Sequence, residues 1–136
     1  MKLLFKIQEA LNKKHNNELL SSIENDKKKY NTLKKEYKSL VLKKRLSLIN
    51  NQFVVYFFLN AITHKDFVFA HKIKSIHNIE NIDLKGAKIA LGRFFHFTSF
   101  HKRAVEYYMP IFSSEKKLDF LDLHRLFTSL VEMAMF

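Results

Sequence analysis

The sequence predicts an all-α fold, in which antiparallel helical hairpins stack as a short repeat-like array behind a basic N-terminal helical arm. Apolar residues recur at intervals of three and four along most of the 136-residue chain, which is the period of an amphipathic helix. Basic residues are concentrated near the N-terminus, since residues 1–50 hold 13 Lys or Arg and only 5 Asp or Glu. Thirteen of the 14 Phe residues lie from Phe53 onward, so the main apolar core is expected in the C-terminal part.

Residues 1–45 are expected to form a basic helical arm or hairpin. A first helix carries Leu4, Ile7 and Leu11 on one face and stops at the polar run 13–17, which favours a turn or a helix cap. A second apolar stripe follows at coiled-coil-like spacing, so the arm is expected to pair with a partner helix or with a second copy of the chain. Its members are Leu19, Ile23, Tyr30, Leu33, Tyr37 and Leu40.

Residues 46–136 are expected to form the helical-hairpin core. Residues 46–62 are apolar at nearly every position, which predicts a buried segment; residues 53–59 also have strand propensity, but their surroundings favour a helix. Asp66 is expected to cap the next helix, and Pro110 to end or kink a later one. The last helix carries an apolar stripe that either docks on the core or belongs to the front part of a longer protein. The stripes of these two helices are Phe67, Ala70, Ile73 and Ile76, and Phe120, Leu123, Phe127, Leu130, Val131 and Ala134.

The most specific pattern lies at residues 85–111, where two amphipathic helical patterns meet at Thr98-Ser99. Two such patterns joined by a short polar break predict a helical hairpin. The small residues Gly92, Ser99 and Ala104 are expected to form a close seam between its two helices, because small side chains let backbones approach.

The same segment resembles the tetratricopeptide repeat. Gly92 is followed, at the spacing of that family, by an aromatic residue (Phe95), a small residue (Ala104) and a second aromatic residue (Tyr108). The resemblance implies a non-catalytic interaction scaffold, either by itself or as the N-terminal or accessory part of a larger enzyme such as a glycosyltransferase.

The residue chemistry does not predict catalysis, and no catalytic, cofactor or metal site is expected. The chain has no cysteine, and its two glycines are too few for a phosphate-binding loop. No two of its seven histidines are three or four residues apart, the spacing that places two metal ligands on one helical face. The apolar run 53–59 is far shorter than the roughly 18 residues of a membrane span, and the N-terminus lacks a secretory pattern. A cytoplasmic protein is expected.

The basic residues are the candidate contacts for a partner. A protein partner or self-association is expected, and no small-molecule substrate is identifiable. The first alternative is a nucleic acid, bound by the lysines of the arm and by the basic and aromatic residues of 93–103. The second is peripheral contact with an anionic membrane surface. The candidate residues are Lys27, Lys28, Lys29, Lys34, Lys35, Lys38, Lys43, Lys44, Arg45, Arg93, His96, Lys102 and Arg103.

Overall fold

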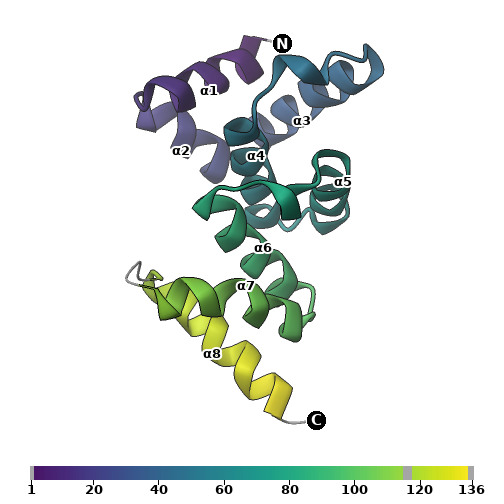
Figure 1. Cartoon of the computed structure of the whole chain (residues 1–136). Coiled ribbons are helices and arrows are strands. Elements are labelled where there is room, and N and C mark those ends of the chain that lie inside the picture. Colours follow the sequence, from purple (N-terminus) through teal and green to yellow (C-terminus); the bar gives the residue numbers. More distant parts are fainter. Residues whose placement is uncertain (1, 115–117, 135–136) are drawn as a thin grey trace. The chain divides into compact units, whose positions relative to one another are not determined.

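The computed structural model describes residues 2–114 and 118–134, and this part of the chain is helical with no β-strand. The all-α prediction is therefore confirmed. The chain divides into two compact units, and the boundary lies between Asp66 and Phe67. Figure 1 colours the first unit purple to teal and the second teal-green to yellow. The expected boundary was at residues 45 and 46; it lies later because the helix that follows residue 50 packs with the N-terminal helices.

The N-terminal unit contains the helices α1 (Lys2–Lys13), α2 (Asn17–Asn25), α3 (Lys27–Leu42) and α4 (Asn51–Thr63), with the 3₁₀ turn η1 (Leu46–Leu48) ahead of α4. Side-chain caps begin three of these helices. Asn16, Asp26 and Asn50 accept hydrogen bonds from the backbone amides of Leu19, Lys28 and Phe53, at 3.3, 2.9 and 2.9 Å respectively. Such caps satisfy amide donors that the helix itself leaves unpaired. The cap at Asn50 starts a helix through residues 53–59, and the strand alternative is wrong.

The apolar stripe of residues 19–40 is buried inside this unit. Asp26 ends α2 and caps α3, so the stripe belongs to two helices and not to one continuous arm. The rings of Tyr30 and Tyr37 both lie against Phe57 of α4, and Glu36 accepts a hydrogen bond of 2.9 Å from the Leu4 amide of α1. The expected coiled-coil arm is wrong because neighbouring helices of the same unit cover its apolar face.

The C-terminal unit contains α5 (Phe67–His77), the 3₁₀ turn η2 (Ile79–Asn81), α6 (Lys85–Phe97), α7 (His101–Ser113) and α8 (Phe120–Ala134). The expected hairpin of residues 85–111 is formed by α6 and α7, and α8 packs against both (Figure 1). Pro110 lies inside α7, which continues for three more residues to Ser113. The helix therefore does not end at the proline.

Gly92 brings α6 close to α7. A Cβ atom at this position would lie 2.8 Å from the ring of Tyr108, closer than real Cβ contacts allow. Ala104 is also fully buried, whereas Ser99 is exposed in the turn between the helices with a φ of 66°. The predicted seam is therefore wrong at Ser99, which is needed for the turn and not for helix contact.

The rotation of α8 differs from what its apolar stripe favours. This helix buries Asp122, Leu126 and Ser129, while Phe127 and Val131 are among the apolar residues left exposed. Of the stripe, Leu123 and Leu130 pack partly buried against the core of the unit, so the stripe docks only in part. A buried carboxylate with four hydrogen-bond donors around it sets the rotation instead.

Candidate docking groove

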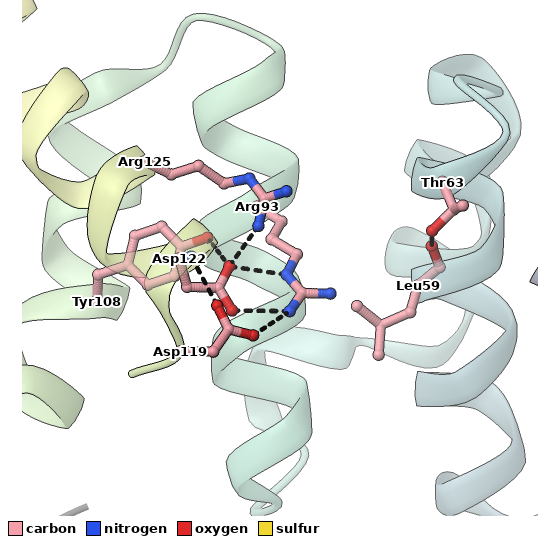
Figure 2. Close-up of polar contacts among 7 residues, drawn as sticks. All are labelled: Leu59, Thr63, Arg93, Tyr108, Asp119, Asp122 and Arg125. Atoms are coloured by element: carbon pink, nitrogen blue, oxygen red, sulfur yellow. Dashed lines mark hydrogen bonds and ion pairs between the residues drawn. The ribbon is translucent and has the colours of Figure 1, made fainter. Parts of the chain in front are cut away.

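A buried ion network fixes the helices that carry the candidate site. The Asp122 side chain of α8 is 1% exposed and accepts two hydrogen bonds from Arg93 of α6, at 2.8 Å from Nε and 2.7 Å from Nη2. Tyr108 of α7 and Arg125 of α8 each donate to Asp122 Oδ1 at 2.8 Å. The backbone amide of Asp122 donates to Asp119, which thereby caps α8. Figure 2 shows these five side chains converging, so the network joins all three helices.

The electrostatics of this network are those of a structural ion pair. Burial by itself raises the pKa of the Asp122 carboxyl, but the hydrogen bonds from Arg93 and Tyr108 and the arginine charge outweigh burial and lower it. Burial, together with the neighbouring Asp122, raises the pKa of Tyr108 far above its ordinary value. The Asp122 carboxylate is ionised and already accepts hydrogen bonds from three side chains. It therefore positions the helices and is not available as a general acid or base.

A second polar cluster lies further along α8. The Nδ1 atoms of His96 and His101 each lie 3.0 Å from the hydroxyl oxygen of the buried Ser129. A hydroxyl can donate to one imidazole and accept from the other, so this geometry suits one neutral acceptor ring and one donor ring. Burial lowers the pKa of His96, and the neighbouring His101, Arg125 and His124 lower it further. The turn at Ser99 brings together two histidines that are five residues apart.

The site with room for a partner is an open apolar groove of about 470 Å³ in the C-terminal unit, hereafter the α5–α6 groove. This volume falls in the range of ordinary binding pockets. One wall comes from α5, the other from the C-terminal half of α6 and the start of α7. The lining residues are Phe67, Val68, His71, Lys72, Lys74, Phe94, Phe95, Thr98 and Phe100.

Large apolar side chains remain exposed at this groove. Val68 is 74% exposed and Phe100 61%; Phe97, which lies against the lining residue Phe67 but does not itself line the groove, is 46% exposed. The rings of Phe67 and Phe97 lie 6.2 Å apart, as do those of Phe95 and Phe100. Contiguous exposed apolar surface of this kind is typical of binding sites, because each such side chain gains free energy when a partner removes it from water.

The charged side chains of the groove are all basic. Lys74 pairs with Glu80 at 3.3 Å and lies over the ring of Phe95, at 5.7 Å from its centroid. Lys72 is exposed, and none of the described carboxylates pairs with it. His71 stacks on Phe94, with the ring centroids 6.4 Å apart. The groove therefore combines aromatic walls with a cation that lacks a counterion.

Besides Lys27, which donates a hydrogen bond of 3.1 Å to the His64 carbonyl while staying exposed, four of the predicted contact residues have structural roles. Lys34 pairs with Asp66 at 2.7 Å, and Arg93 is held by Asp122. Arg103 pairs with Glu80 at 3.1 Å and covers the ring of Phe95. His96 is bound to Ser129. The charges or polar atoms of these side chains are already used within the fold.

The remaining predicted residues are exposed. Most lie on or just after α3, and Lys102 lies in the first turn of α7. On α3 the only carboxylate, Glu36, binds the Leu4 amide, so the outer face of this helix is strongly basic. The exposed residues are Lys27, Lys28, Lys29, Lys35, Lys38, Lys43, Lys44, Arg45 and Lys102.

The sequence analysis missed the apolar members of the groove. Phe94 and Phe95 are buried and Phe97 is exposed, because one face of α6 does not bury all three. Val68 is out of register with the buried Ala70 and Ile73 of its own helix. A large apolar residue out of phase with its helical stripe was therefore the signal available in the sequence.

Among the described residues, no group of three or more His, Asp or Glu side chains is placed to hold a metal ion. None of the described helices combines the length and the apolar character that crossing a bilayer requires.

Comparisons of the chain with protein-family models, with curated proteins and with solved structures gave no match.

Proposed function

We propose that this chain is a non-catalytic helical interaction module that holds a protein partner in the α5–α6 groove. The observation that carries the proposal is the exposure of Val68 and Phe100 on the walls of a groove of about 470 Å³. Aromatic side chains in a concave surface are typical of the anchor sites of protein interfaces. The zero cysteine count fits a cytoplasmic setting.

The proposal keeps the resemblance of residues 85–111 to a tetratricopeptide repeat. Gly92 against Tyr108 and the buried Ala104 support it, because they are the close contacts that such a hairpin needs. Repeat proteins of this kind use exposed helical surfaces to hold partners. In this proposal α6 and α7 form the hairpin that supports one wall of the groove.

Selection of peptides from a display library against the full chain tests this function. Enriched peptides should bind the unaltered protein and lose at least about tenfold in affinity to the double variant Val68→Asn, Phe100→Asn. Asn matches Val in helix propensity, and at residue 100 it occupies the N-cap position of α7, so the double variant should fold. The control is Ile76→Asn, another exposed residue of α5 outside the groove. Equal binding to all three proteins would exclude the groove as the site.

The basic face of α3 favours a second candidate, a nucleic-acid-binding protein. Lys28 and Lys35 are exposed on this face, and Glu36 is occupied by the amide of Leu4. A stripe of lysines without compensating carboxylates attracts phosphate groups.

Binding to a labelled oligonucleotide at increasing salt tests this candidate. Affinity should fall steeply with salt, and replacing Lys27, Lys28 and Lys29 by Ala should reduce both the affinity and the salt dependence. Absent binding at low salt, or binding that salt does not change, would exclude it.

A further inference from the structure

We propose that the partner of the α5–α6 groove is an acidic amphipathic helix, whose apolar stripe fills the groove and whose carboxylates face Lys72. This inference rests on the proposed function and adds the chemistry of the partner. It follows from three features of the groove: its apolar walls, the sign of its charges, and which of its cations are paired with a carboxylate.

The walls favour a helical ligand with apolar anchors. Val68 stands on α5, Phe95 on α6, and Phe100 directly before α7, so apolar side chains border the groove on both sides. A helix laid between two helices presents residues i, i+3, i+4 and i+7 as one stripe, which fits such a surface. Exposed aromatic rings are rigid, so their burial by a partner costs little conformational entropy.

The charges select the polar face of this ligand. His71, Lys72 and Lys74 line the groove, and none of the described residues that line it carries a carboxylate. A basic helix would bring like charges together, whereas an acidic helix would gain favourable pairs at the rim. The whole chain has a net charge of +11, which adds a long-range attraction for an acidic partner.

The ion pairs of the C-terminal unit show which cation of the groove can pair with a partner. Lys74 and Arg103 share Glu80, at 3.3 and 3.1 Å. Both cations also lie over the ring of Phe95, so a carboxylate already sits beside the aromatic wall of the groove. Lys72 has no such carboxylate among the described residues. It is therefore the cation that a partner is expected to pair with.

The test uses three synthetic peptides of about 20 residues, long enough to form several helical turns. The first has a Leu and Phe stripe at helical spacing and Glu on its polar face. The second has the same stripe with Lys in place of Glu, and the third has the composition of the first in scrambled order. Binding of each peptide to the full chain is measured by fluorescence anisotropy at low and moderate salt.

The acidic amphipathic peptide should bind at least about tenfold more tightly than the other two, and salt should reduce this difference. The charge reversal Lys72→Glu should weaken its binding about tenfold. The control Lys85→Glu changes the net charge equally at an exposed lysine of α6 outside the groove, and it should change binding less than about twofold. Circular dichroism verifies that both variants fold.

The outcomes separate this inference from the proposed function. If the basic peptide binds as tightly as the acidic one, or if both lysine reversals weaken binding equally, the acidic partner is wrong while the groove stays the site. If the scrambled peptide binds equally, the helical ligand is wrong. If no peptide binds, or if the double variant at residues 68 and 100 binds them unchanged, the docking function of the groove is itself overturned.

Discussion

Asp122 shows how one buried charge organises the C-terminal unit. A carboxylate without partners in this position would cost several kcal/mol of folding free energy, but Arg93, Arg125 and Tyr108 supply four hydrogen bonds to it. Two of these partners come from other helices, so the bonds specify how α6, α7 and α8 meet. The network is therefore a positioning device for the hairpin and α8.

Replacing Asp122 by Ala should lower the free energy of unfolding by about 3–5 kcal/mol, because the partly buried Arg93 and Arg125 lose the buried carboxylate that they share. Urea titration followed by circular dichroism measures this change. Asp119→Ala is the control; it removes the cap on the Asp122 amide and a longer, exposed ion pair with Arg93 at 3.5 Å, and it should cost about 1 kcal/mol. Since folding lowers the pKa of Asp122, its stabilisation is full above the ordinary value of 3.8 and is lost as the pH falls through the folded value. Equal losses in the two variants would contradict the role of the network.

His96 makes stability sensitive to mild acid. Burial is the main cause of its lowered pKa, and His101, Arg125 and His124 add to it. The unfolded chain thus binds a proton more readily than the folded one, so stability is full above the ordinary pKa of 6.5 and falls as the pH drops below it. His77, whose pKa burial also lowers, acts in the same direction.

The melting temperature should therefore decrease between pH 7.5 and pH 5.5, and His96→Gln should reduce the slope of this decrease. Thermal unfolding at several pH values measures it. The exposed His15 offers a matched control, since His15→Gln removes an imidazole from α1's C-terminal flank without touching the Ser129 cluster. Identical slopes in the three proteins would rule out the contribution of His96.

The packing of α6 on α7 depends on the missing side chain of Gly92. Ala would raise helix propensity by about 1 kcal/mol, but its Cβ would lie 2.8 Å from the Tyr108 ring. That ring is fully buried and its hydroxyl is bound to Asp122, so it has little freedom to move. The steric cost should exceed the gain in propensity.

Gly92→Ala is expected to lower the stability by about 1–2 kcal/mol through overpacking. Gly86→Ala tests the same change of residue type in the same helix and should leave stability unchanged or higher. Thermal melts of both variants give the comparison. A stabilised Gly92→Ala protein would show that α6 and α7 do not approach as closely as described.

The rotation of α8 illustrates a limit of helical periodicity. Three large residues of its apolar stripe, Phe120, Phe127 and Val131, are exposed, while the stripe residues Leu123 and Leu130 are partly buried. Periodicity identifies which residues share a face of a helix, but not which face meets the neighbouring helices. Here hydrogen bonds to the buried Asp122 and Ser129 decide it.

Each unit has buried core residues of its own. Tyr30, Tyr37 and Phe57 are central to the first, and Tyr108 and Leu126 to the second. Each unit is small, so each holds only a modest margin of stability. A local defect is therefore expected to act within one unit.

Hydrogen exchange measured by mass spectrometry tests this independence. Asp122→Ala should speed amide exchange in α6, α7 and α8 and leave α1 to α4 protected as before. Asp26→Ala removes the cap of α3 and should have the reverse distribution. Increased exchange throughout the chain in either variant would show that the two units unfold together.

The amino-acid pattern was sufficient for the all-α class, for the hairpin of residues 85–111 and for the close approach at Gly92. These features depend on helix propensity, on helix caps and on side-chain size, and short stretches of sequence determine all three. The pattern also identified the residues of the 19–40 stripe as apolar and periodic. It did not reveal that α1 and α4 cover them.

The groove and the ion network arise from contacts between residues far apart in the chain. Arg93 and Asp122 are 29 positions apart, and no local pattern connects them. Val68 and Phe100 become neighbours of one groove only when α5 meets the α6–α7 corner. Short stretches of sequence determine the periodicity of each helix. Burial and charge pairing instead depend on which helical faces come into contact, and only the folded chain decides that.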